Sequence, residues 1–384
     1  MSKNSNSPFP NKSQELLLQA ALLKGEPMKK AWNEWKLAVD FEKDIAYASF
    51  RMLPLLYNNL HTQGVKDALM PRLKGMYRKS WSNNHLLFHK TAKVLKLLHS
   101  NEIPTIVMKG IALTIEVYKN YSVRPMADMD ILVPLAQSGK TIDILKNEGW
   151  ILQNEQYLEF NLKYGRSATF HDSEKTELDL HWHPIFEAHD NISKDDFWDS
   201  SVSLEVAGEK TRAFCLTDNF FHTIVHGLRY NPEPPIRWVA DAFTILNSED
   251  CIIDWNRLLR HTKKFRVSLQ MKDALNYLIE NFQAQVSRNF LEELDKIKST
   301  FSDRLVFHHA KKYGDDNPKT VYEKLYSVYA AYLRQSKHTG LWVQHIGFVR
   351  YMHFRTKEKP YFRILIYYSS LLFKKTKKTK IKPD

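Results

Sequence analysis

Apolar residues recur at helical spacing through the first hundred residues of the chain. The segment SQELLLQAALLKG repeats leucine on one face, so we predict a helix that is capped by Ser13 and stops at Gly25. The next apolar stretch keeps this spacing, and Pro54 is expected to bend or break it. Residues 85–101 have the pattern of another amphipathic helix. Residues 1–100 are therefore predicted to be an N-terminal helical region.

The pattern changes at Ile103. Two short apolar runs, IPTIVMKG and DMDILVP, are typical of buried strands, and a helical segment follows each. The segments YLEFNLKY, SATFHD and TELDLHWH alternate apolar and polar residues, which predicts strands. This order indicates a small α/β core at residues 101–205. Helical spacing then returns, which predicts a C-terminal helical region at 206–373 and a basic tail at 374–384. We therefore predict an α+β protein with a small mixed sheet flanked by helical regions.

Composition supports a globular, helix-rich protein. Of the 384 residues, 43% are hydrophobic and only 12 are glycine, which disfavours a large Rossmann sheet or a β-sandwich. The two cysteines, Cys215 and Cys251, are too few for a disulfide framework or a four-cysteine metal site. The polar N-terminus lacks a signal-peptide core, and the apolar segment 361–373 is too short to span a bilayer. These features predict a cytoplasmic protein.

The formal net charge of +13 is partly a property of the tail. The last eleven residues contain six lysines and one aspartate. Such a tail is either a solvated end, which we favour, or a weak contact for nucleic acid or an anionic surface. The positive charge elsewhere suits a polyanionic ligand such as a nucleoside triphosphate.

Two aspartates stand one residue apart in the segment VRPMADMDILV. Alternate residues of a strand share a face, so Asp128 and Asp130 point the same way with Cα atoms about 6.5–7 Å apart, while Met129 faces a core. Carboxylates this close repel each other unless a cation lies between them. Magnesium takes oxygen ligands of this kind together with water and phosphate oxygens.

A third carboxylate is available in TELDLHWH. Glu177, Asp179 and His181 share one face if this segment is a strand. Asp179 is the better third ligand for a two-metal site, with Glu177 in reserve. His181 is expected to orient a ligand rather than to bind metal directly.

An Asp-x-Asp pair before a strand is also a common turn and cap signature. Three features favour a functional site: the glycine-ended strand and helix upstream, the nearby arginine, and the second acidic strand downstream.

These segments together resemble a known superfamily. The stretch IPTIVMKGIALTIEVYKNYSVRPMADMDILVP, followed by LKNEGW and ELDLHWHP, is similar to the nucleotidyltransferases typified by DNA polymerase β, and more narrowly to a bacterial family of uncharacterised nucleotidyltransferases. The resemblance covers about residues 50–290 and implies a triphosphate contact at Gly110. It also implies that Asp128, Asp130 and Asp179 hold two metal ions, Mg²⁺ or Mn²⁺.

One position departs from the superfamily pattern. Ile111 follows Gly110 where a serine would usually contact phosphate, whereas Lys109 before the glycine fits the narrower family. Lys109 and Arg124 are candidate cations for the phosphates. For each, the alternative is a salt bridge to the paired aspartates.

Other candidate sites have simpler explanations. His222 and His226 have the spacing of zinc proteases, but threonine stands where the catalytic glutamate would follow the first histidine. We expect them to be structural or to line a cleft. Trp238 and Asp241 are expected to pack an interface, with a contact to the nucleobase as the alternative.

The sequence therefore predicts an enzyme that transfers a nucleoside monophosphate from a triphosphate to an acceptor and releases pyrophosphate. The acceptor could be a small molecule, a protein or RNA. Two other classes stay open, namely a nucleic-acid-binding or nucleic-acid-modifying protein and a non-catalytic interaction module with the same fold. The clustered like charges argue against the last, since they are costly without a cation.

Overall fold

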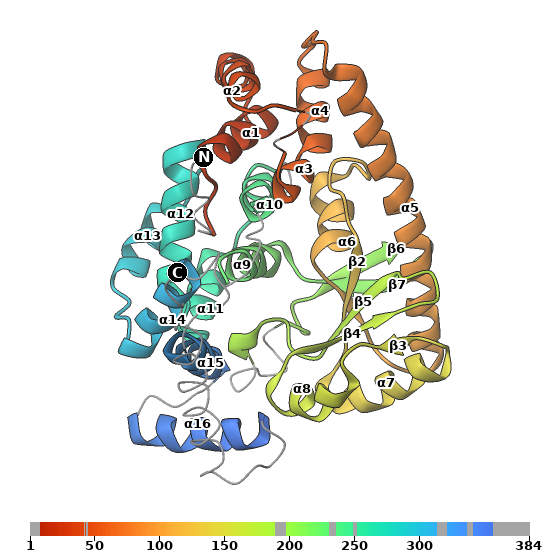
Figure 1. Ribbon diagram of the computed structural model, residues 1–384, viewed down its shortest axis with the longest axis vertical. Coiled ribbons are helices and arrows are strands. Elements are labelled where there is room, and N and C mark those ends of the chain that lie inside the picture. The colour runs from red at the N-terminus through yellow and green to blue at the C-terminus, as the bar shows by residue number, and fades with distance from the viewer. Residues whose placement is uncertain are drawn as a thin grey trace, which may run out of the picture.

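The chain is described by a computed structural model that covers residues 8–41, 43, 45–188, 197–229, 236–248, 252–312, 321–335 and 341–355. Within these ranges, helices surround a seven-stranded mixed sheet (Figure 1). The α+β prediction is confirmed.

The sheet has the strand order β3-β4-β5-β2-β1-β7-β6. Its central strand β2 pairs in parallel with β5 and antiparallel with β1. The strands predicted at DMDILVP, SATFHD and TELDLHWH are β2, β4 and β5, whereas β3 and the β6–β7 hairpin were not expected. The expected core boundary at residue 205 falls inside β6, and the sheet continues through β7. The strands are β1 (Ile106–Val107), β2 (Asp128–Leu132), β3 (Ile151–Leu152), β4 (Ser167–His171), β5 (Glu177–His181), β6 (Val202–Val206) and β7 (Glu209–Ala213).

The two faces of the sheet have different neighbours. Fully buried Met129 and Ile131 of β2 point into a hydrophobic core with residues of α5 (Met70–Ser100), α6 (Lys109–Leu113) and α7 (Ser138–Asn147). Asp128 and Asp130 alternate with these residues and therefore point to the opposite face. Helix α5 runs along the outer edge of the molecule (Figure 1).

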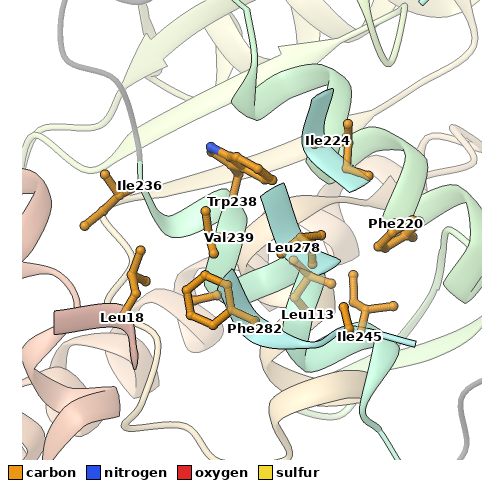
Figure 2. Close-up of a cluster of buried hydrophobic side chains, with 14 of the residues drawn as sticks. Leu18, Leu113, Phe220, Ile224, Ile236, Trp238, Val239, Ile245, Leu278 and Phe282 are labelled. Carbon is orange, nitrogen blue, oxygen red and sulfur yellow. The ribbon is translucent and has the colours of Figure 1, made fainter. Parts of the chain in front are cut away.

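The helices before and after the sheet pack into one body. Leu18 of α1 belongs to the same hydrophobic core as Val239 of α10 and Phe282 of α12 (Figure 2). The indole N–H of Trp238 donates to the carbonyl oxygen of Pro8 at 2.9 Å. The helices outside the sheet layer are α1 (Lys12–Leu22), α2 (Gly25–Ala38), α3 (Tyr47–Phe50), α4 (Leu53–Thr62), α9 (Leu216–Gly227), α10 (Arg237–Leu246), α11 (Trp255–Lys264), α12 (Ser268–Phe282), α13 (Arg288–Asp295), α14 (Phe301–Lys312), α15 (Val321–Gln335) and α16 (Leu341–Arg355).

The strand predicted at YLEFNLKY is wrong, because this segment forms helix α8 (Leu158–Tyr164). Leu158 and Leu162 pack on the sheet core, whereas Phe160 and Tyr164 pack on a second cluster with α16. Each pair is four residues apart and so shares one side of a helix. Two apolar sides separated in this way produce the same alternation as a strand.

Smaller differences concern element ends. Asn11 rather than Ser13 caps α1, and its side chain accepts from the backbone N–H of Gln14. Helix α1 ends at Leu22, and Gly25 begins α2 instead of ending α1. The helical run after α6 continues as a π-helix, Thr114–Tyr118.

No helix among the described residues is long and apolar enough to cross a membrane. The segment 361–373 and the basic tail lie outside the described residues.

Candidate active site

Two parallel strands bring four carboxylates together. In the register of β2 and β5, Asp128 lies opposite Glu177 and Asp130 opposite Asp179. Neighbouring strands are only about 4.8 Å apart, and these four residues share one face of the sheet. Asp130 is buried and the other three are half-buried. The acidic residues that the sequence singled out therefore form one cluster, which we call the acidic wall.

Three polar side chains contact the acidic wall. Nε2 of buried His181 lies 2.9 Å from Oδ1 of Asp130, and the ammonium of Lys109 donates to the same oxygen. On the neighbouring strand β4, the hydroxyl of Thr169 donates to Oδ1 of Asp179 at 2.6 Å. Asp130 and Asp179 thus each have one oxygen held in a defined direction.

The surroundings shift the pKa of Glu177 and that of His181 in opposite directions. Burial raises the pKa of Glu177, and the negative charges of Asp179 and Asp128 raise it further. Burial and the positive charge of Lys109 hold the pKa of His181 well below its ordinary value. His181 is therefore a neutral imidazole. A carboxylate only accepts hydrogen bonds, so Nε2–H of His181 donates to Asp130.

The donor set fits a hard divalent cation. Carboxylate oxygens of Asp128, Glu177 and Asp179 all lie within 4.8 Å of one another. Ligand atoms of Asp130, Asp179 and His181 form a second set within the same distance. Oxygen ligands from a few carboxylates are the usual protein contribution to a magnesium site. Asp179 belongs to both sets, as a ligand shared between two ions would.

The acidic wall lines a cavity of about 350 Å³ that also carries several cations. Arg51, Arg229 and Arg237 make no ion pair with a carboxylate of the described residues. Burial lowers the pKa of each of these guanidinium groups, that of Arg237 to about 9. Half-buried cations without an ion-pair partner are partly desolvated, and an anionic ligand would compensate their charge. Cations that line the cavity are Arg51, Lys109, Arg124, Arg229 and Arg237.

Arg124 lines this cavity, and it forms an ion pair with Asp241 rather than with the paired aspartates. Its Nε and Nη2 donate to the two carboxylate oxygens of Asp241 at 2.9 and 2.8 Å. The alternative of a salt bridge to Asp128 or Asp130 is therefore wrong. Tyr118 also donates to Asp241, at 2.8 Å. Arg124 thus joins the acidic strand to α10.

A family model and a solved structure match this chain. The model of a family described as uncharacterised nucleotidyltransferase matches residues 45–283, which is more than half of the chain. The chain belongs to this nucleotidyltransferase family. No curated protein matches it. A solved structure, that of an antigenic nucleotidyltransferase-like protein from Paracoccidioides brasiliensis, matches with 13% identity and a TM-score of 0.32; the match covers 57% of this chain and 95% of that chain.

Gly110 has a packing role beside the implied phosphate contact. A Cβ atom at this position would lie 2.6 Å from Nη1 of Arg124 and 2.7 Å from Sδ of Met126. Only glycine therefore allows the Arg124 guanidinium to lie against α6. Lys109, which precedes it, has a φ of 50°, a left-handed conformation that non-glycine residues rarely adopt. Such strain is typical of functional sites.

His222 and His226 also line the cavity. Their rings stack at 5.4 Å, and burial holds the pKa of both well below the ordinary value, so both are neutral. Trp238 packs on Gly227, where a Cβ atom would lie 2.3 Å from the tryptophan Cβ. This contact and the Asp241–Arg124 pair agree with the expected packing of α10 rather than with a contact to the nucleobase.

Several residues of the site were missed by sequence reasoning. Arg51 and Arg229 lie just after helices α3 and α9, and Arg237 begins α10; a single arginine at such a position carries no local signal. Thr169 could have been found, since the alternation of SATFHD places it on the same face as its neighbour Asp179 once β4 and β5 are paired. Asn84 of α5 was also missed; its amide donates to the carbonyl oxygen of Arg124 at 2.9 Å and thereby holds the loop before β2.

Proposed function

We propose that the protein is a metal-dependent nucleotidyltransferase that moves a nucleoside monophosphate from a nucleoside triphosphate to an acceptor and releases pyrophosphate. The observation that carries this proposal is the meeting of Asp128, Asp130 and Asp179 at one wall of a cavity otherwise rich in arginine. Membership of the nucleotidyltransferase family supports the same chemistry. The acceptor class, a small molecule, a protein or RNA, is left open.

Asp128, Asp130 and Asp179 would hold Mg²⁺ or Mn²⁺, with Glu177 as a further ligand. Bound metal would draw the triphosphate to the acidic wall and offset negative charge that develops at the reacting phosphorus. In the structure, the Lys109 ammonium donates a hydrogen bond to Oδ1 of Asp130. When nucleotide binds, we expect its ammonium to move to a phosphate oxygen, which is a strong charge-assisted partner.

The arginines account for the remaining phosphate charge. Arg51, Arg229 and Arg237 are half-buried cations at the cavity that form no ion pair with a carboxylate among the described residues. Guanidinium groups bind phosphate oxygens with two parallel hydrogen bonds, so they would hold the β- and γ-phosphates in place during transfer. Arg124 contributes chiefly by orienting the loop before β2, because Asp241 already takes two of its donors.

Asp179 is our proposed general base. The acceptor hydroxyl oxygen would attack the α-phosphorus, the bond between the α-phosphorus and the bridging oxygen to the β-phosphorus would break, and the hydroxyl proton would pass to Asp179. The Thr169 hydroxyl holds one oxygen of Asp179 and thereby fixes the direction of the carboxylate. His181, as a neutral donor to Asp130, keeps that ligand aligned in the same way.

The experiment that tests this proposal does not require a known acceptor. The protein is incubated with each nucleoside triphosphate carrying the label on the α- or the γ-phosphate, with Mg²⁺ or Mn²⁺, and with water, total RNA or small-molecule pools as acceptors. We expect label from the α-position in products and label from the γ-position in pyrophosphate. Release of γ-label as inorganic phosphate would contradict nucleotidyl transfer.

Matched variants connect the activity to the site. Asp128→Asn should abolish transfer, whereas Asp143→Asn, at an exposed position of α7, should leave it unchanged. Transfer that survives in Asp128→Asn would overturn the metal assignment. Failure to bind any triphosphate with either metal, measured by calorimetry, would favour the non-catalytic interaction module. A cytoplasmic location stays a prediction from the sequence.

A further inference from the structure

Helix α5 carries a cationic surface that the proposed chemistry does not use. Its 31 residues include seven lysines and arginines and no aspartate or glutamate. Lys90 is paired with Asp172 and Glu174, so one cation has a structural partner. The N-terminal half of the helix, with Lys74 and Arg78, lies away from that pairing and is exposed.

Cations and aromatic rings share one stripe of this helix. Lys74, Arg78, Trp81 and His85 follow one another at spacings of four, three and four residues, which places them on one side of an α-helix. We call these four residues the α5 stripe. Trp81 is 51% exposed although tryptophan is usually buried. Its ring lies 4.3 Å from that of His85, which in turn lies 5.1 Å from Tyr121, itself 38% exposed.

Arg78 and Trp81 of the stripe line a hollow of about 470 Å³. The rest of its lining comes from Tyr77 of α5 and from the loop Lys119–Ser122. Asn120 and Ser122 add an amide and a hydroxyl group to the aromatic and cationic lining. The loop is held in place, since the Asn84 amide donates to the carbonyl oxygen of Tyr121 at 2.6 Å. This surface is therefore concave, partly aromatic and positively charged, and its loop is fixed by the hydrogen bond from Asn84.

We propose that the α5 stripe and Tyr121 bind single-stranded nucleic acid. Exposed rings beside cations are the combination that such strands require, because bases stack on aromatic side chains while lysine and arginine follow the phosphates. The acid-free helix is complementary in charge to a phosphate backbone. A membrane would need a continuous apolar face, whereas two of the four residues of the stripe, Lys74 and Arg78, are charged.

The bound strand would lie close to the proposed active site. Tyr121 lines the hollow and Arg124, three residues further on, lines the cavity with the acidic wall. A strand that leaves the stripe along this loop would reach the carboxylates with its end, which would make it an acceptor. That last step rests on the proposed function, whereas the binding itself does not.

Fluorescence anisotropy of a short labelled oligouridylate with the full-length protein tests the proposal. The titration is carried out in EDTA, so that it is independent of metal and of transfer activity. Trp81→Ala should weaken binding at least about fivefold, because one stacked base is lost, while Trp81→Phe should restore most of the affinity. Arg78→Gln should weaken binding and lower the slope of affinity against salt by about 1.

Lys93→Gln is the matched control. It removes an exposed cation from the same helix, three turns beyond Trp81, and should change the affinity less than about twofold. Trp81 is half-exposed, so thermal unfolding of the variants should match that of the unaltered chain. Because the titration contains EDTA, a failure to bind the oligonucleotide is distinct from a failure of the proposed transfer, which the α-label assay measures separately.

Other outcomes would overturn the proposal. Equal affinity in Trp81→Ala, Arg78→Gln and the unaltered protein would move binding to another surface, such as the basic tail. Equal affinity for duplex RNA would exclude base stacking. Loss of binding to phosphatidylserine vesicles in Trp81→Ala, without any binding of RNA, would show that the stripe contacts lipid.

Discussion

The protein contains two kinds of buried or half-buried acid, one in the helical body and one on the sheet. Asp218, fully buried, accepts from Arg257 at 2.7 and 2.8 Å and lies 3.0 Å from His261. Asp241 is matched in the same way by Arg124. Although burial by itself raises the pKa of both aspartates, their cationic partners outweigh it and lower both values. These acids are neutralised from within the protein.

The acidic wall is different. Asp128 and Glu177 lie directly opposite each other, and the pKa of Glu177 is raised by burial and by its acidic neighbours. Within the described residues, Lys109 is the cation that forms an ion pair with this cluster, through Asp130, with neutral His181 as a hydrogen-bond donor. The difference indicates that the acids of the helical body hold the fold together, while those of the wall depend on a cation from outside.

The largest expected effect tests the structural half of this comparison. Asp241→Asn keeps the shape of the side chain but leaves the Arg124 guanidinium buried and uncompensated. We expect the free energy of unfolding to fall by about 3–5 kcal/mol, measured by urea denaturation. Asp143→Asn, at an exposed position, should change it by less than about 0.5 kcal/mol. Unchanged stability of Asp241→Asn would show that the pair is dispensable for the fold.

Glu116 is an intermediate case, with an amide as its hydrogen-bond partner. Asn219 donates to it at 3.5 Å, and burial raises its pKa to about 7. A folded pKa above the unfolded value of 4.5 means that its contribution to stability is complete below that value and is lost as pH rises through about 7. Glutamine cannot ionise, so Glu116→Gln removes this loss of stability at high pH.

The expected result is a stability difference that depends on pH. Glu116→Gln and the unaltered protein should unfold alike in acid, and above pH 8 the variant should be more stable by about 2 kcal/mol after allowance for partial exposure. Urea denaturation at several pH values measures the difference. A constant difference across the range would show that Glu116 does not titrate between its ordinary pKa and 7.

The sequence was sufficient to predict which face of the sheet a side chain points to, because that depends only on alternation within the residue's own strand. Period-two alternation placed Asp128 and Asp130 on one face, and the same rule placed Glu177 and Asp179 together on another strand. That both strands would pair in parallel, with these residues in register, was not predictable, because pairing joins segments about fifty residues apart.

Long-range partners could not be predicted for a similar reason. Asp241 lies 117 residues after Arg124 in the chain, and only the packing of α10 beside the loop before β2 makes them a pair. Arg51, Arg229 and Arg237 also lie at or just beyond the ends of three separate helices. Local patterns can likewise be ambiguous, as α8 shows: its two apolar sides give the alternation of a strand.

Lys109 gives one acid of the wall, Asp130, a cationic partner from within the protein, as the acids of the helical body have. Its ammonium lies where a metal ion would bind. Lys109→Met removes this competitor, so we expect Mg²⁺ to bind about tenfold more tightly in the absence of nucleotide, as measured by calorimetry. Nucleotidyl transfer should fall at the same time, since the phosphate contact is lost. Lys93→Met, also a loss of one exposed lysine charge, should change neither property. Weaker Mg²⁺ binding in Lys109→Met would show that the ammonium supports the site rather than competing for it.

The smallest expected change in stability is the most informative for the acidic wall. Asp128→Asn removes one of two like charges directly opposite each other on β2 and β5, a repulsion of about 0.2–1 kcal/mol. Metal-free Asp128→Asn should therefore unfold at the same urea concentration as the unaltered protein or a slightly higher one, and salt should reduce the difference. Saturating Mg²⁺ should stabilise the unaltered protein by roughly 2–3 kcal/mol and leave the variant unchanged. A loss of stability comparable to that of Asp241→Asn would instead place Asp128 among the structural acids, because an acid that waits for a cation from outside should not be needed for folding.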